Sequence, residues 1–304
     1  MEISGYALIE EIHAGPSTRI FTANRIQDET PVLIKALRAR HPSEQDISRL
    51  RREYQFLKEL KHPGIIRTLA LEPSDNGLAM VMEDARAVPL SRARIEGWEE
   101  WCGIALSITE TLAFVHDHHI IHKDLKPDNI LKTADGTRLI DFGIAVRLEQ
   151  ETTAPLPPSR LEGTLSYISP EATGRINRPV DARSDLYSLG VTLYETLFGH
   201  PPYQGQDPLE LVHAHLTGKP NFPAETVFGA KTPPAVIAIV MKAMARDVTA
   251  RYQSARGLAH DLKAFLKLVQ EGDLFQNFTA GTLDQPTDFH LPTTLFGREN
   301  DKRE

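Results

Sequence analysis

Two acids, two lysines, a histidine and an asparagine occupy positions 122–129, which read HKDLKPDN. The pairs Ile120-Ile121 and Ile130-Leu131 flank this segment, so its charges are predicted to lie against a buried core. Asp141-Phe142-Gly143 begins 12 residues after Asn129, behind a short strand-like run. Mg²⁺ prefers carboxylate and carbonyl oxygens together with phosphate, and a further acid can orient a hydroxyl and accept its proton. An isolated Asp is usually a turn former or a helix cap, but this order of residues favours a magnesium and phosphate site.

A lysine and a glutamate nearer the N-terminus form a second candidate pair. In the run Val32-Leu33-Ile34-Lys35, alternation puts Leu33 and Lys35 on one face of a strand. Glu53 is expected on a helix, beside the inward-facing residues Leu50, Tyr54 and Leu57. A lysine that ends a buried strand needs an anion, and Glu53 can reach it. A surface lysine and a solvated helix glutamate are the alternative interpretation.

The elements that must position these residues change character along the chain. Runs rich in β-branched or aliphatic residues between turn signals predict strands at 6–12, 20–25, 31–37 and 78–83. Apolar residues at helical spacing predict a helix at 43–60, with Ser43 and Asp46 as a capping box. Beyond about residue 90 helices dominate, including 234–246 and 255–270.

This distribution predicts an α+β protein of two lobes. A small β-rich lobe is expected at 1–85, a larger, mostly helical lobe at 86–270, and a linker at 271–304. The segment 84–94 joins the lobes, and 148–162, rich in proline and threonine without periodicity, is expected to be a mobile loop.

Composition narrows the class of protein. The chain has 304 residues, is 41% hydrophobic and carries a formal charge of −7, which gives no reason to expect a nucleic-acid partner. The one cysteine, Cys102, excludes an internal disulfide and is expected to be a core thiol. We see no signal peptide and no apolar run of about 18 residues, so no membrane segment is expected. A cytoplasmic protein is the expectation.

The motifs HKDLKPDN and DFG resemble the catalytic and metal-binding loops of eukaryotic-type (Hanks-type) protein kinases, and the resemblance covers roughly residues 6–268. It implies a bilobal fold with a small antiparallel N-lobe that contains one helix. It also implies that Asp124 is the catalytic base, that Lys126 contacts the γ-phosphate, and that Asn129 and Asp141 hold Mg²⁺, with Mn²⁺ as an alternative ion. Phe142 would set the active and inactive states.

The same resemblance assigns an ATP pocket. Lys35, paired with Glu53, would contact the α- and β-phosphates, and Met82 to Ala85 match the gatekeeper and hinge that bind adenine. The implied nucleotide-binding residues are Ile12, Gly15, Ile20, Leu33, Lys35, Met82, Glu83, Ala85 and Leu131.

Three departures from the family pattern fall in or near this pocket. The phosphate loop, 13–20, keeps one glycine of three, Gly15, and is expected to be stiffer. Leu33 replaces the usual alanine and should narrow the adenine site. Lys123 replaces an arginine that receives the activation-loop phosphate, which predicts weaker dependence on phosphorylation because lysine lacks the bidentate fork. The candidate autophosphorylation sites, which are alternatively ordinary polar loop residues, are Thr152, Thr153 and Ser159.

Downstream motifs extend the resemblance. GTLSYISPE at 163–171 resembles the end of an activation segment, with serine for the usual alanine. Asp185 matches an acid that braces the catalytic loop, and Arg251 matches the arginine that pairs with Glu171.

The substrate expected from the resemblance is a protein serine or threonine hydroxyl. Asp-x-Lys-x-x-Asn, with Thr164 in the substrate-side loop, resembles the serine/threonine class. Tyrosine kinases usually have a different catalytic-loop sequence, and small-molecule kinases lack the Gly-Thr…Pro-Glu segment.

A narrower resemblance connects YISPEATGRINRPVDARSDLYSLGV, ARYQSARGLAHDLKAFL and FHLPTTLFGREN with bacterial hybrid proteins. In these an N-terminal kinase domain precedes an AAA-type ATPase, often followed by a sensor histidine kinase. It implies a signalling module of a larger protein, with ATPase and histidine kinase modules as partners and the ATPase beginning at the C-terminal residues. A complete kinase with a disordered tail is the alternative.

Two functions remain open from the sequence. The first is an active phosphotransferase, which the six positions Lys35, Glu53, Asp124, Lys126, Asn129 and Asp141 favour. The second is a catalytically weak, pseudokinase-like module that gates a C-terminal ATPase, which only the altered phosphate loop and Leu33 support.

Overall fold

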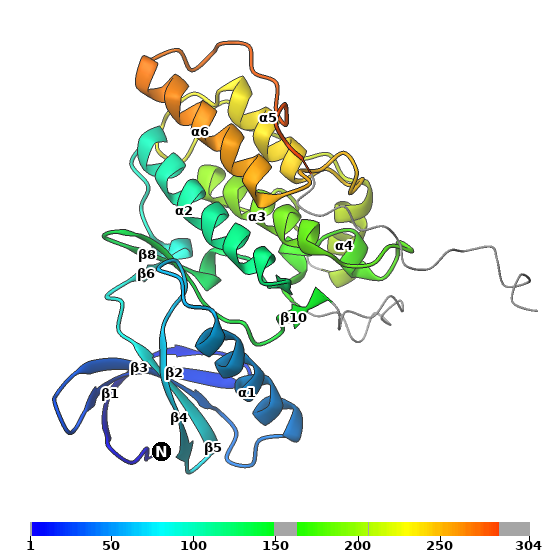
Figure 1. Cartoon of the computed structure of the whole chain (residues 1–304). Helices are drawn as coiled ribbons and strands as arrows, with labels where there is room; N and C mark the ends of the chain where they lie inside the picture. Colours follow the sequence, from blue (N-terminus) through cyan, green and yellow to red (C-terminus); the bar gives the residue numbers. More distant parts are fainter. Residues whose placement is uncertain (1, 149–162, 206, 286–304) are drawn as a thin grey trace, which may run out of the picture.

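A five-stranded antiparallel sheet forms the N-terminal lobe of the computed structural model, which describes residues 2–148, 163–205 and 207–285 (Figure 1). The strand order is β1-β2-β3-β5-β4. The strands are β1 (Tyr6–Ala14), β2 (Thr18–Arg25), β3 (Pro31–Leu37), β4 (Thr68–Ser74) and β5 (Gly77–Glu83). Sequence periodicity missed β4, which lies at the sheet edge, carries Pro73 and has a register irregularity between Thr68 and Ala70. Proline is tolerated there because an edge strand leaves one side unpaired.

Helix α1 (Glu44–Glu59) lies between β3 and β4 in sequence and packs against the sheet. Its buried residues are Leu50, Glu53, Phe56 and Leu57, so one charged side chain is buried with the apolar ones. The predicted capping box is only half formed. The Ser43 hydroxyl accepts from the Asp46 amide at 3.1 Å, but the Asp46 carboxylate accepts from that hydroxyl at 2.6 Å. The Asp46 side chain is shorter than that of Glu, so its carboxylate bonds the Ser43 hydroxyl instead of the Ser43 backbone amide.

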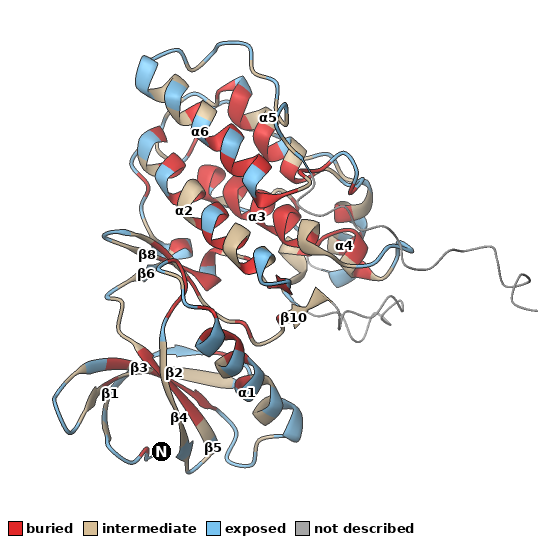
Figure 2. Cartoon of the chain, viewed as in Figure 1, coloured by how far each residue is buried: buried red, intermediate tan, exposed pale blue. Residues whose placement is uncertain are grey.

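The second lobe is helical. Its helices are α2 (Trp98–Asp117), α3 (Ala182–Phe198), α4 (Pro208–Thr217), α5 (Pro234–Ala243) and α6 (Ala255–Glu271). Helix α3 is almost entirely buried, with the other helices around it (Figure 2). Cys102 lies in this core, where burial raises the pKa of its thiol to about 12, so its assignment as a core thiol is confirmed. The predicted helix 234–246 ends at Ala243, and α4 was not predicted because only Val212 and His215 of it are buried.

Short strands bracket both motifs that carry the chemistry. The segment 122–129 lies between β7 (Ile120–Ile121) and β8 (Ile130–Thr133), and 141–143 lies between β9 (Gly136–Leu139) and β10 (Val146–Arg147). β8 pairs with β9, β7 pairs with β10, and the two-residue β6 (Val88–Pro89) pairs with β8. Ile120, Ile121, Ile130 and Leu131 are buried, as their flanking positions predicted. The charged turns are therefore fixed at both ends by small sheets.

The predicted α+β bilobal architecture is confirmed, while the boundaries at residues 85 and 270 stay predictions. Residues 272–285 were expected to begin a linker, but they fold back along the helical lobe after α6 (Figure 1). The remainder of the predicted linker lies outside the described residues. None of the described helices combines the length and hydropathy that a membrane crossing requires.

Candidate active site

Lys35 joins the two lobes through a pair of carboxylates. Its Nζ lies 2.8 Å from both carboxylate oxygens of Glu53 on α1, and 2.9 Å from Oδ1 of Asp141, beyond β9. The Lys35 and Glu53 side chains are 9% and 3% exposed, whereas that of Asp141 is 39% exposed. Alternation in β3 therefore turns Lys35 toward α1, as the sequence predicted, and the second motif reaches the same ammonium.

The charges of these three residues do not cancel. The nearby Lys35 ammonium lowers the pKa of Asp141 to about 2. Burial alone would lower the pKa of Lys35, but the carboxylates of Asp141 and Glu53 outweigh it and hold that pKa above its ordinary value. Burial raises the pKa of Glu53, against the attraction of Lys35. One ammonium shared by two carboxylates leaves the more exposed one, Asp141, able to attract a cation.

The Asp124 carboxylate accepts four hydrogen bonds from the described residues. Its Oδ2 accepts from Lys126 Nζ at 2.8 Å and from Asn129 Nδ2 at 2.9 Å. Its Oδ1 accepts from the amide and the hydroxyl of Thr164, both at 2.9 Å. The Thr164 hydroxyl also accepts from Lys126 Nζ at 2.6 Å. A carboxylate fixed in this way presents its oxygens in one orientation, which suits a group that accepts a proton.

Asn129 and Asp141 come together through the β8–β9 hairpin. The Ile140 amide donates to the Asn129 carbonyl at 3.0 Å, which places Asn129 beside the residue that precedes Asp141. Asn129 uses its side-chain nitrogen on Asp124, so its amide oxygen is the atom available to a metal. A carboxylate and an amide oxygen are hard donors of the kind that Mg²⁺ or Mn²⁺ takes with phosphate oxygens. The residues present therefore fit the implied ion.

A buried acid supports the turn that carries Asp124. Asp185 on α3 is fully buried and accepts from the amides of His122 and Lys123, each at 2.8 Å. His116 Nε2 lies 2.9 Å from the same carboxylate. Lys123 has a φ of +69°, a left-handed conformation that costs energy for a residue with a side chain. The predicted bracing role of Asp185 thus has a physical reason, because its hydrogen bonds stabilise this strained turn.

The Asp141 motif is held from the core side. Asp141 has a φ of +65°, and Phe142, which is fully buried, packs its ring 4.6 Å from the ring of His122. His122 Nε2 lies 3.1 Å from the Ile140 carbonyl. The two motifs therefore contact each other through His122 as well as through Asn129.

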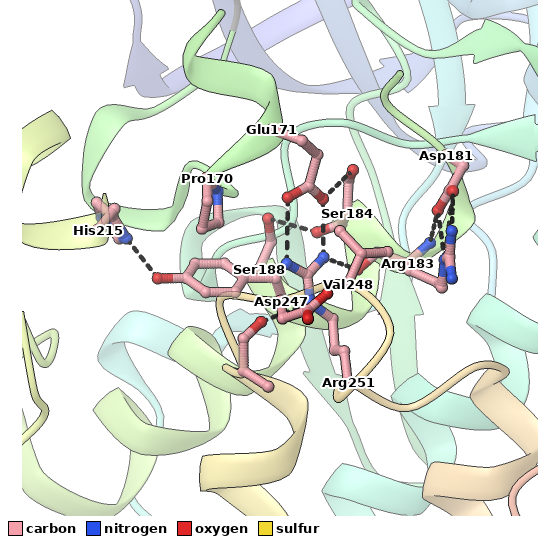
Figure 3. Close-up of polar contacts among 12 residues, drawn as sticks. Pro170, Glu171, Asp181, Arg183, Ser184, Ser188, His215, Asp247, Val248 and Arg251 are labelled. Atoms are coloured by element: carbon pink, nitrogen blue, oxygen red, sulfur yellow. Dashed lines mark hydrogen bonds and ion pairs between the residues drawn. The ribbon is translucent and has the colours of Figure 1, made fainter. Parts of the chain in front are cut away.

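A second buried ion pair lies at the end of the segment that contains Thr164. Figure 3 shows the Arg251 guanidinium facing the Glu171 carboxylate, with N–O distances of 2.8 and 3.1 Å. Ser184 donates to the same carboxylate at 2.6 Å, and Arg251 also donates to the Arg183 carbonyl. Both charged side chains are almost completely buried. The predicted pairing of Arg251 with Glu171 is the arrangement in the structure.

The proposed nucleotide-pocket residues come from both lobes. Ile20 pairs with Lys35 and Leu33 pairs with Met82 across the sheet, and Leu131 lies on β8 in the other lobe. Met82 and Leu131 are 5% and 8% exposed, and Leu33, Glu83 and Ala85 are half-buried. Ile12 is 43% exposed, beside an irregularity in β1. The set brackets the position of Lys35, but its role in nucleotide binding stays a proposal.

The altered phosphate loop is a tight hairpin between β1 and β2. The Gly15 amide donates to the Thr18 carbonyl at 2.8 Å. Arg38 lies just beyond β3. Its backbone amide donates to the Ser17 carbonyl at 2.8 Å, and its Nη1 donates to the Gly15 carbonyl at 3.1 Å. These hydrogen bonds fix the backbone of the loop, which gives a physical basis for the predicted stiffness.

Sequence reasoning missed Arg38 as a contributor to the site and did not assign Thr164 a contact with Asp124. Thr164 lies 40 residues beyond Asp124, and only the tertiary fold brings the two together. The suggested phosphorylation sites Thr152, Thr153 and Ser159 lie outside the described residues, so the prediction about Lys123 also stays a prediction.

Comparison with known proteins identifies the family of the chain. A probable serine/threonine-protein kinase of Corynebacterium efficiens is 32% identical over 270 residues, covering 85% of this chain and 41% of the relative. Serine/threonine-protein kinase PknB of Mycolicibacterium smegmatis is 33% identical over 277 residues, covering 86% of this chain and 41% of that protein. The chain therefore spans about two fifths of the length of these relatives. Residues 6–262 match the protein kinase domain, and the chain belongs to this family.

Proposed function

We propose that this chain is a serine/threonine protein kinase that transfers the γ-phosphate of ATP to protein hydroxyls. The observation that carries the proposal is the contact of Lys35 with Glu53 and Asp141, made while Asn129 links the Asp141 hairpin to Asp124. These contacts support the proposal, because phosphoryl transfer needs a phosphate-binding lysine, metal-binding oxygens and an acid for the hydroxyl close to one another. The names of the relatives, serine/threonine-protein kinases, support the same class.

On the phosphate side, Lys35 would contact the phosphates of ATP, because its ammonium is buried, charged and fixed between two acids. Asn129 and Asp141 would hold Mg²⁺, which when bound neutralises charge on the phosphate oxygens. The Asp141 carboxylate has a lowered pKa, so it is ionised and ready to bind a cation at neutral pH.

On the hydroxyl side, Asp124 would orient the substrate hydroxyl and accept its proton. The substrate oxygen forms a bond to the γ-phosphorus while the bond from that phosphorus to the β,γ-bridging oxygen breaks, and ADP leaves. Lys126 donates to Asp124 and Thr164, so its ammonium is held where it can balance negative charge on the transferred group. Thr164 keeps Oδ1 of Asp124 in one orientation.

The pseudokinase-like alternative is the weaker proposal. The two missing glycines of the phosphate loop and the bulk of Leu33 would lower nucleotide affinity, but neither disturbs the contacts among Lys35, Glu53 and Asp141. Assembled ion pairs favour an enzyme with modest nucleotide affinity over a module without chemistry.

We further propose that the chain acts as a cytoplasmic signalling module, with downstream ATPase and histidine kinase modules as partners. The support is the resemblance of FHLPTTLFGREN, at 289–300, to the start of such ATPase domains.

Incubation with Mg²⁺, labelled ATP and a generic basic protein tests the main proposal. The wild-type chain should label serine and threonine, and Asp124→Asn should reduce kcat by about 10²- to 10⁴-fold, because general-base catalysis contributes that much. Asp128→Asn is the matched control, since this exposed acid lies in the same turn and bonds Ser91. An inactive wild type, or equal rates for wild type and Asp124→Asn, would refute the proposal.

A further inference from the structure

A buried acid lies beyond the residues that match the kinase family. Asp284 is 13 residues past the end of α6, and its side chain is only 3% exposed. Its Oδ2 accepts from the Gln253 amide at 2.8 Å, and its Oδ1 accepts from the Ser254 amide at 3.3 Å. Lys242 Nζ lies 3.9 Å from the same carboxylate. Because Ser254 is the N-cap of α6, Asp284 places negative charge at the positive end of this helix.

We call residues 272–285, which follow α6, the strap. The surface of α6 has space for the strap because residue 257 is a glycine. A Cβ at Gly257, in the first turn of α6, would lie 2.1 Å from Asp284 Oδ1. Within the strap, the amide of Gly281 donates to Asp261 Oδ2 at 2.6 Å. Asp261 also accepts from the Tyr252 hydroxyl, so a second buried acid fastens the strap. The strap is therefore packed at two points, Gly281 and Asp284.

Gln253, which bonds Asp284, also organises the loop before α6. Its side-chain nitrogen donates to the carbonyls of Val248 and Arg251, at 2.9 and 2.7 Å. Its side-chain oxygen accepts from Arg183 at 2.8 Å. Arg251 in turn forms the buried pair with Glu171, at the end of the segment that contains Thr164. A continuous set of hydrogen bonds thus runs from Asp284 through Gln253 and Arg251 to Glu171.

We propose that Asp284 is a positioning residue, and that the strap stabilises the substrate-side segment 163–171 through Gln253, Arg251 and Glu171. Displacement of the strap would loosen that segment and weaken binding of the protein substrate, while the ATP side of the cleft stays unchanged. The family match ends at residue 262, so the strap itself lies outside the matched kinase domain, while the residues that receive it lie inside. The effect on substrate rests on the proposed function, but the effect on segment 163–171 does not.

Hydrogen exchange on the 304-residue chain tests the coupling without any assay of activity. Asp284→Gly should speed exchange of the Thr164, Tyr167 and Arg251 amides, which are hydrogen-bonded in the structure, by about tenfold or more. Asp273→Gly is the matched control, because this strap acid is exposed and its substitution keeps the amide that bonds Leu268. Unchanged exchange at Thr164 and Tyr167 in Asp284→Gly would overturn the proposal.

A double-mutant cycle tests the packing that carries the argument. Gly257→Ala should destabilise the wild-type chain, because the new methyl group collides with the Asp284 carboxylate. In the Asp284→Gly background the same change should stabilise, since alanine is favoured over glycine in a helix. The change in sign is the expected result, and the same sign in both backgrounds would contradict a packed strap.

Steady-state kinetics then separate this inference from the proposed function. If the wild type transfers phosphate, Asp284→Gly should raise KM for the protein substrate about threefold or more and leave KM for ATP unchanged, with Asp284→Asn between the two because it keeps one oxygen acceptor. Unchanged KM for the protein substrate would contradict the effect on substrate binding. If the wild type transfers none, the proposed function fails while hydrogen exchange still decides the coupling.

Discussion

The candidate site has two walls, one from each lobe, and they differ in how closely they follow the kinase pattern. On the C-terminal wall, Asp124, Lys126 and Asn129 match the family pattern and are joined by hydrogen bonds. Asp185 accepts from the backbone of the same turn, at His122. On the N-terminal wall, the proposed phosphate loop has one glycine where the family pattern has three, and Arg38 donates to its backbone. The difference supports a division of roles in which the proposed reacting groups are fixed by hydrogen bonds and the proposed phosphate loop contributes to nucleotide affinity. We therefore expect substitutions on the first wall to affect kcat, and those on the second to affect KM for ATP.

Lys35→Met should have the largest effect of the substitutions on the N-terminal wall, because its ammonium is proposed to contact the phosphates. We expect kcat to fall about 100-fold or more, since a charge-stabilising contact to phosphate is lost. The measurement is the rate of phosphate transfer at saturating ATP, with folding checked by circular dichroism. A higher KM for ATP with an unchanged kcat would assign Lys35 to nucleotide binding only.

Thr164→Val tests the hydrogen bonds of the C-terminal wall. It removes the hydroxyl that donates to Asp124 and accepts from Lys126, so kcat should fall about tenfold with KM for ATP unchanged. Thr164→Ser is the matched control, because it keeps the hydroxyl and should stay close to wild type. Equal loss in both variants would show that the methyl group matters instead.

Arg38→Ala should affect the N-terminal wall alone. The Gly15 carbonyl loses a donor and the loop becomes less ordered, so KM for ATP should rise about threefold because more order must be gained on binding. The control is Arg40→Ala, an exposed arginine two residues away. A change in kcat instead of KM would break the proposed division between the walls.

Acid titration should show a smaller effect at the junction of the walls. Lys35 lowers the pKa of Asp141 to about 2 from 3.8, so this carboxylate stabilises the folded state above about pH 4 and loses that contribution as pH falls toward 2. Wild type should therefore lose more unfolding free energy over this range than Asp141→Asn. Parallel curves for the two proteins would contradict the contact between Lys35 and Asp141.

The family resemblance was enough to bring Asp124, Lys126 and Asn129 together, because these residues lie within one turn. The positions of Lys35 and Glu53 also followed from strand and helix periodicity. The distant pair of Arg251 and Glu171 came from the family resemblance alone. Two other contacts were not predicted: Thr164 reaches Asp124 across 40 residues, and Arg38 reaches Gly15 across a hairpin. Residues 272–285 lack periodicity, so nothing local indicated that Asp284 is buried. The strand β4 was hidden by its proline and irregular register.

Calorimetric titration with a non-hydrolysable ATP analogue tests the central claim, that Lys35 and Asp141 bind one nucleotide–metal complex beside Asp124. Wild type should bind the analogue in a saturable way, with affinity that increases when Mg²⁺ is added. Asp141→Asn should lose the increase due to Mg²⁺, while Arg38→Ala should keep it. Absence of binding by the wild type at millimolar nucleotide and Mg²⁺, or an Mg²⁺ effect that survives in Asp141→Asn, would contradict the account.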